Sequence, residues 1–203
     1  MFDDPGESSA RKRLMDAAIL LFTTRGYAAT SVREIVEMAG VTKPALYYHF
    51  QSKEGIYLAI LEDLERIADE GIAASRVVAG TAREKLQEFL LAIFRLFETK
   101  KKEVRMMNAV FWGPAQGAPP FDFDVFHEKL RRVIAEIVSE GIASGDLKPG
   151  DPEDMTLALM GVLSFNMDLT LAHPERGLGQ EGLRRVLDLV FAGLAAPANQ
   201  ESA

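Results

Sequence analysis

The sequence predicts an all-α protein of about nine helices, and three observations support this fold class. Apolar residues recur at i, i+3, i+4 and i+7 along most of the chain, which is the spacing of one buried helix face. Two periodic segments are preceded by Ser or Thr with Glu three residues later, and glycines follow several others. No segment shows the sustained apolar–polar alternation that is typical of a half-buried strand.

Composition narrows the class of protein. Of the 203 residues, 48% are hydrophobic, which is enough for a sizeable core, and 26% are charged. The chain has no cysteine, and its three histidines are scattered without metal-ligand spacing. The N-terminus lacks a signal-peptide pattern, and no uninterrupted apolar run is long enough to span a membrane. We therefore expect a soluble cytoplasmic protein with no metal, no cofactor and no membrane contact.

The charge is distributed unevenly along the chain. The whole chain carries −7, but residues 8–53 contain seven basic and three acidic side chains, which leaves −11 on the remainder. A basic segment on an acidic body confines the attraction for phosphate to one end of the molecule. This distribution favours a nucleic-acid-binding domain over residues 8–54, followed by a second domain over residues 55–197.

The first forty residues predict two helices. The first has an apolar stripe from Leu14 to Phe22 and ends at Gly26. Ser31 and Glu34 have the spacing of a capping box, which opens a short second helix that Gly40 ends.

A third short helix follows over residues 42–50, and the pair predicts a helix-turn-helix. Thr42 can cap this helix, Pro44 is tolerated in its first turn, and Leu46 and Phe50 share its inner face. Ser52 then caps a long fourth helix. In a helix-turn-helix the second short helix enters the major groove of DNA, with its N-terminal residues nearest the bases.

The outward residues of the third helix have the chemistry that DNA contact needs. Lys43 can donate to guanine, while Pro44 and Ala45 can contact a thymine methyl group. Tyr47, Tyr48 and His49 can donate to phosphate oxygens. Two further phosphate sites are predicted at helix starts, one formed by Thr30 and Ser31 and the other by Lys53. Arg33, one turn further into the second helix, could reach a base.

Residues 11–57 resemble the N-terminal domain of the tetracycline-repressor (TetR) family of bacterial regulators. The stretches that carry the resemblance are residues 17–22, 26–27, 30–35 and 39–50, together with Lys53. The resemblance implies that family members touch DNA at the positions of Thr42, Lys43, Pro44, Tyr47, Tyr48, His49 and Lys53. A common family choice at position 44 is glycine, where this chain has proline. Beyond residue 55 the similarity lies in length and helix count alone.

The last two long helices are expected to dimerise. The family resemblance implies a four-helix bundle with the partner's copies, and the residues agree, because a helix that is apolar all round from Leu157 to Leu163 must be covered on more than one side. Paired operator half-sites also require two headpieces. The alternative is that both helices fill the core of a monomer. The residues assigned to dimerisation are Leu159, Val162, Leu163, Leu183, Val186, Leu187, Val190 and Phe191.

Aromatic residues and methionines concentrate in the middle of the chain, which indicates a pocket for an apolar or aromatic effector. Ordinary core packing is the competing interpretation for each of them. The residues assigned to this pocket are Phe94, Phe97, Met107, Asn108, Phe111, Trp112, Phe126 and Asn166. The segment Gly113–Pro120 is expected to be a loop. The segment Gly177–Gly182 matches the letters of a dinucleotide-binding motif, but it follows a helix rather than a strand, so we expect a loop there too.

Together these features predict a ligand-responsive repressor rather than an enzyme. A homodimer would bind a palindromic operator, and an effector held among the central helices would displace the fourth helix and release the DNA. Two alternatives stay open. An all-α enzyme would need a nucleophile–base pair or a carboxylate dyad, and none can be read from the spacing. A protein-binding helical module would retain no DNA fragment.

Overall fold

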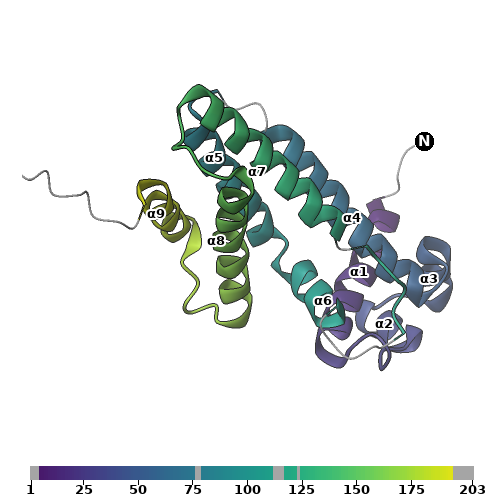
Figure 1. Ribbon diagram of the computed structural model, residues 1–203. Helices are drawn as coiled ribbons and strands as arrows, with labels where there is room; N and C mark the ends of the chain where they lie inside the picture. The colour runs from purple at the N-terminus through teal and green to yellow at the C-terminus, as the bar shows by residue number, and fades with distance from the viewer. Residues whose placement is uncertain (1–4, 76–78, 112–116, 123, 194–203) are drawn as a thin grey trace, which may run out of the picture. The chain divides into compact units, whose positions relative to one another are not determined.

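The computed structural model describes residues 5–75, 79–111, 117–122 and 124–193, and every regular element in these ranges is an α-helix (Figure 1). The all-α expectation, with nine helices in the described part, is confirmed. The helices are α1 (Pro5–Arg25), α2 (Val32–Ala39), α3 (Lys43–Phe50), α4 (Lys53–Ser75), α5 (Ala82–Thr99), α6 (Lys101–Phe111), α7 (Asp124–Ser144), α8 (Pro152–Ala172) and α9 (Gly179–Ala192).

The chain forms two compact units. The first unit comprises Met1–Glu70 and Phe97–Phe126, and the second comprises Gly71–Leu96 and His127–Ala203. The helix α4 contributes residues to both units, as does α5. The predicted domain boundary after residue 54 therefore falls inside the first unit. The assignment of DNA binding to residues 8–54 and of ligand binding and dimerisation to residues 55–197 stays a prediction.

The predicted helix signals act largely as expected in the first unit. Gly26 follows α1 with φ 84°, and Gly40 follows α2 with φ 60°, a left-handed conformation that glycine adopts without strain. The Oγ of Ser31 accepts from the amide of Glu34, whose carboxylate accepts from the amide of Ser31 in return, so the capping box is complete. Thr42 does stand at the cap position of α3, but its side chain makes no capping hydrogen bond.

The core of the first unit is built from α1, α2, α3 and α4 with one residue of α6. Phe22, Tyr27 and Tyr57 form an aromatic cluster at its centre, with ring centroids 5.2–6.1 Å apart. Leu46 and Phe50 are buried, as their spacing predicted, and they hold α3 on this core. Met106 of α6 is fully buried in the same cluster, which fits the close packing of α6 on α1.

The second unit contains α7, α8, α9 and most of α5, and polar contacts join its helices. Arg83 of α5 pairs with Asp188 of α9 at 2.8 Å, and Arg131 of α7 pairs with Glu153 of α8 at 3.0 Å. Its core holds large apolar side chains from all four helices; they include Leu86, Phe89, Phe94, Leu130, Ile134, Leu159, Leu163, Leu183 and Leu187. The capping box at Thr81 and Glu84 opens α5 as predicted.

One helix start differs from the sequence expectation. The expected loop over Gly177–Gly182 is wrong in its second half, because α9 begins at Gly179. There the amide of Gly182 donates to the carbonyl of Leu178, and the bare glycine accommodates the Leu178 side chain that lies against it.

Candidate DNA interface and apolar face

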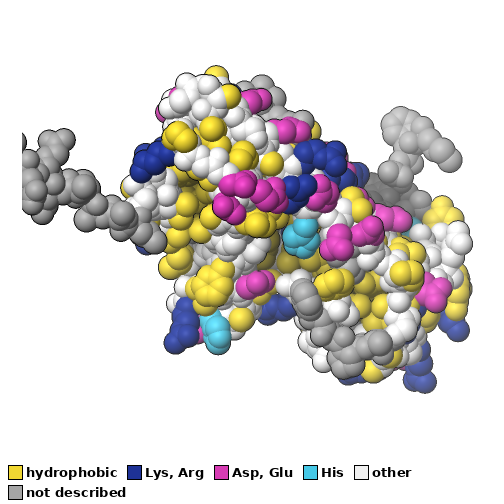
Figure 2. Space-filling view, in the orientation of Figure 1, with side chains coloured by type: hydrophobic (Ala, Val, Ile, Leu, Met, Phe, Trp, Pro, Cys, Tyr) yellow, Lys and Arg dark blue, Asp and Glu magenta, His cyan; other side chains and the backbone are white. Residues whose placement is uncertain are grey.

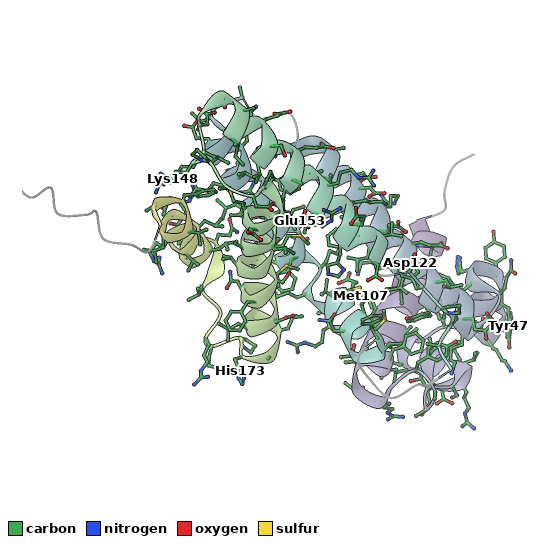
Figure 3. All side chains as sticks on the ribbon, viewed as in Figure 1. Tyr47, Met107, Asp122, Lys148, Glu153 and His173 are labelled. Atoms are coloured by element: carbon green, nitrogen blue, oxygen red, sulfur yellow. The ribbon has the colours of Figure 1, made fainter. Side chains whose placement is uncertain are left out.

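The outer surface of α3 carries the predicted DNA-binding side chains. Thr42, Lys43 and Pro44 are exposed, Ala45 and His49 are half-buried, and the large rings of Tyr47 and Tyr48 are 46% and 72% exposed. Figure 3 shows Tyr47 extending away from the helices of the first unit. Because Leu46 and Phe50 fix the opposite side of this short helix in the core, the exposed set faces outward together.

Two ring contacts order this surface. The Nζ of Lys43 lies 5.7 Å from the centroid of the Tyr47 ring one helical turn away, a cation–π distance. The rings of Tyr48 and His49 meet edge to face at 5.1 Å. These contacts restrict the exposed side chains before any partner arrives, which lowers the entropy cost of binding.

The start of α2 is held by polar contacts rather than left open. The hydroxyl of buried Thr30 donates to the carbonyl of Gly26, and Arg25 pairs with Glu34 at 2.5 Å. Thr30 thus orients the connection between α1 and α2, while Ser31 beside it is exposed. Arg33 is exposed, and its Nε pairs with Glu37 at 2.7 Å, which engages one of the five guanidinium donors.

Lys53 occupies a different environment from Lys43. Its Nζ donates to the carbonyls of Tyr27 and Thr30 at 2.8 and 3.0 Å. The same atom lies 4.1 Å from the centroid of the Tyr27 ring. Burial lowers the pKa of this ammonium from its usual value. Two of the three N–H donors of this predicted phosphate ligand are thus engaged within the first unit.

The two C-terminal helices, α8 and α9, pack side by side, and they present an apolar face (Figures 1 and 2). Of the residues assigned to dimerisation, Val162, Val186 and Phe191 are half-buried and Val190 is exposed. The remaining four are buried within their own chain and offer little surface to a partner; these are Leu159, Leu163, Leu183 and Leu187.

Sequence reasoning missed the most exposed apolar residues of this face. Leu157 is 55% exposed, Phe165 is 70% exposed and Leu189 is 58% exposed. Leu157, Gly161 and Phe165 follow one another at intervals of four, so they form one stripe along α8. That spacing was present in the sequence, but it did not distinguish the two apolar sides of α8.

Gly161 and Phe165 of this stripe also line a groove of about 480 Å³ between α8 and α9. Its lining is apolar except for Asn166, which is 4% exposed and whose amide oxygen and nitrogen have no hydrogen-bond partner in the described structure.

By length and composition alone α8 could cross a membrane, because its most apolar 18-residue window has a mean hydropathy of 1.4. Only 28% of that window is buried inside the described chain. The same features fit a helix that another protein surface covers.

Comparison with known proteins identifies the chain's relatives. Residues 14–60 match the model of bacterial regulatory proteins of the tetR family. The HTH-type transcriptional repressor KstR2 of Mycolicibacterium smegmatis is 30% identical over 155 residues, which is 72% of each chain. The chain belongs to the TetR family. It is therefore a DNA-binding transcription regulator and not an enzyme.

Solved structures agree with this assignment. The TetR family regulator PfmR of Thermus thermophilus superposes with a TM-score of 0.73 at 27% identity, covering 92% of this chain and 98% of its own. AibR, whose structure was solved with isovaleryl coenzyme A and operator DNA, gives a TM-score of 0.66 at 21% identity over 90% and 98% of the two chains. The AibR likeness shows the shared fold.

The residues assigned to an effector pocket fall in both units of this TetR family protein. In the second unit Phe94 and Asn166 are buried. In the first unit Phe97 is buried, Phe111 is exposed, and the others are half-buried, namely Met107, Asn108 and Phe126. Figure 3 shows Met107 on α6. Trp112 lies outside the described residues, and the pocket stays a prediction.

Proposed function

We propose that this protein is a cytoplasmic repressor that binds a palindromic operator as a homodimer and is released by a small effector with an apolar or aromatic body. The surface of α3 is the observation that carries the proposal. Exposed Lys43, Pro44, Tyr47 and Tyr48 stand opposite buried anchors, which is the arrangement by which a recognition helix enters a major groove.

The roles within the interface follow from chemistry and exposure. Lys43 stands in the first turn of α3, where it can donate to guanine O6 or N7. Tyr47, Tyr48 and His49 can donate to phosphates that flank the groove. Thr30 supports this surface from within, because its hydroxyl is committed to Gly26.

The apolar face of α8 and α9 supports the dimer. It carries a projecting side chain, Phe165, at the wall of the groove, so a two-fold axis can place the ring of each copy against the groove of the other. A Cβ added to Gly161 would meet no atom within 4 Å, so the centre of the stripe is open to close approach by another helix. We assign Leu157, Phe165, Leu189 and Val190 to the interface ahead of the four residues that their own chain buries.

Two observations support the effector class. Aromatic residues and methionines gather in α5 and α6, and a structural relative, AibR, was solved with isovaleryl coenzyme A. An acyl group of that kind has the apolar body that such residues accommodate. We therefore include short acyl thioesters among the effectors to be tested.

The first experiment is a selection of genomic DNA fragments by the purified 203-residue protein, followed by affinity measurements on the fragments retained. Lys43→Ala should weaken operator binding by about 1–3 kcal/mol, roughly 5- to 150-fold. Lys102→Ala removes an exposed lysine from α6 and serves as the matched control, with little change expected. An effector should lower the affinity of the unmodified protein by about 5- to 150-fold.

Two outcomes would contradict the proposal. Retention of no fragment at low salt would remove operator binding. Equal affinities for the Lys43→Ala and unmodified proteins would remove α3 as the reading helix, provided that circular dichroism shows both proteins folded.

A further inference from the structure

Three side-chain contacts join the C-terminal part of α9 to the start of α5. The Nη2 of Arg83 donates to the Oδ1 of Asp188 at 2.8 Å, and the Nε2 of Gln87, one helical turn along α5, donates to the same oxygen at 3.2 Å. The Cζ of Arg83 also lies 5.7 Å from the centroid of the Phe191 ring, a cation–π distance. We call these four residues the α5–α9 clamp.

The clamp holds a part of α9 that has little apolar attachment to its own chain. Leu183 and Leu187 are buried and fix the earlier part of the helix on the core of the second unit. Beyond Leu187, none of the described residues of α9 is buried. The position of this last part of the helix therefore depends on the clamp and on backbone hydrogen bonds rather than on core packing.

The same part of α9 carries two exposed apolar residues of the proposed dimer face. Leu189 is 58% exposed and Val190 is 36% exposed, and both lie between Asp188 and Phe191 in the chain. Because Asp188 and Phe191 are three residues apart, they share one side of the helix. Fixing that side also fixes the direction in which Leu189 and Val190 project.

The α5 end of the clamp is itself firmly held. The amide of Ala82, next to Arg83, donates to the carboxylate of Asp146 at 3.0 Å. Ala82 also packs so closely on Gly141 of α7 that a Cβ at this glycine would overlap the Ala82 side chain. Arg83 thus projects from a helix start that backbone and packing contacts keep in place, so it can act as a fixed reference for α9.

We infer that the α5–α9 clamp positions the last part of α9 for dimerisation, with Asp188 as the central positioning residue. This inference rests on the proposed function and deepens it, because it gives polar residues a role in self-association. The side chains of Arg83 and Asp188 are 48% and 45% exposed, so the ion pair alone contributes little. The shared oxygen of Asp188 and the ring contact join it to a network that rotation of α9 would break as a whole.

An exchange of charges in the full-length protein tests the inference. Arg83→Asp and Asp188→Arg each place two like charges at the contact, whereas the double variant restores an opposite pair. Each single change suits its helix, because Asp is favourable in the first turn of α5 and Arg is favourable near the end of α9. In the double variant the amide of Gln87 can rotate so that its oxygen accepts from the new arginine.

Sedimentation equilibrium measures the effect on the dimer. An exposed ion pair contributes up to about fivefold to an equilibrium constant, and the loss occurs in both copies. We therefore expect the dissociation constant to rise roughly 10-fold in each single variant and to return within about threefold of the unmodified value in the double variant. Lys102→Asp makes the same change of charge as Arg83→Asp at an exposed position of α6, and this control should leave the constant unchanged.

Hydrogen exchange reports on α9 independently of dimerisation. All proteins are diluted below their dissociation constants, so that a partner contributes no protection. Amides of residues 189–193 should then exchange faster in each single variant and recover in the double variant, while those of α2 and α3 keep their protection. If a reversed-charge variant does not fold, Asp188→Asn replaces it, because it removes the charge but keeps the shape; a rise of about threefold in the dissociation constant is then expected.

Two results would overturn the inference. One is a pair of single variants that dimerise as tightly as the unmodified protein. The other is a double variant that recovers neither the dissociation constant nor the exchange protection. If the unmodified protein stays monomeric at every concentration, the proposed dimer fails, and recovered protection in the double variant would still show that the clamp holds α9.

Discussion

Phe165 provides the sharpest test of the proposed dimer. Its ring is 70% exposed on the stripe of α8, and an aromatic side chain buries about 150–250 Å² when it is fully covered. A partner that covers the exposed seven tenths would therefore remove on the order of 100–175 Å² from water per copy. At about 25 cal/mol per Å², and allowing for the Cβ that alanine keeps, Phe165→Ala should cost about 2–3 kcal/mol per copy.

In a two-fold symmetric dimer both copies carry the substitution, so this loss of binding energy occurs twice. The expected penalty of about 4–6 kcal/mol corresponds to a rise in the dimer dissociation constant of roughly 10³- to 10⁴-fold. Sedimentation equilibrium over a wide concentration range measures this constant directly. Operator binding by Phe165→Ala should then become steeply dependent on protein concentration, because two headpieces must first be brought together.

A pair of leucines controls for loss of apolar surface as such. Leu157 on α8 and Leu20 on α1 are 55% and 53% exposed, so each loses a similar exposed area when it is replaced by alanine. Leu157→Ala should weaken the dimer, whereas Leu20→Ala should leave it unchanged. Dimers that withstand both Phe165→Ala and Leu157→Ala, or that respond as strongly to Leu20→Ala, would refute the assignment of this face.

Three further predictions concern the first unit. Gly55→Ala should lower the free energy of unfolding by about 1–3 kcal/mol in a denaturant titration, because the new Cβ overlaps the Phe50 carbonyl. Burial raises the pKa of Tyr27 to about 12, and its hydroxyl has no hydrogen-bond partner in the described structure. The folded state therefore favours the neutral phenol, so that stability falls as pH rises from about 10 to about 12; Tyr27→Phe should reduce this loss and cost no stability at neutral pH. Hydrogen bonds from Ser31 lower the pKa of Glu34, so the stabilising contribution of this carboxylate is present above pH 4.5 and is lost as pH falls below that value. The melting temperature of Glu34→Gln should therefore fall less in acid than that of the unmodified protein. An equal fall in both proteins would contradict the role of the capping box.

The helix-turn-helix was predictable because its signals are local. A capping box needs only Ser31 and Glu34, and a terminating glycine such as Gly40 needs only its own conformation. The interval of four between Leu46 and Phe50 likewise determined which side of α3 faces the core. Each of these features depends on residues within one or two helical turns, so the sequence contained the information directly.

The remaining features depend on residues that are distant in the chain. The sequence placed a basic residue at the start of α4, but only the folded chain brings the Tyr27 and Thr30 carbonyls to Lys53. On α8 the apolar residues surround the helix, so periodicity could not show that Leu159 and Leu163 are covered by their own chain while Phe165 is not. Burial within one chain and burial by a partner have the same hydrophobic signature.

The shared core of the first unit has a consequence for protein engineering. Ile56, Tyr57, Ile60 and Leu61 of α4 pack with α1–α3, and Met106 joins them from a distant part of the chain. A fragment cut after residue 54 would expose this apolar surface and lose its interior contacts, so we expect it to aggregate. To change the operator specificity of this regulator, α3 side chains should therefore be replaced within the intact scaffold, rather than the whole N-terminal segment being exchanged.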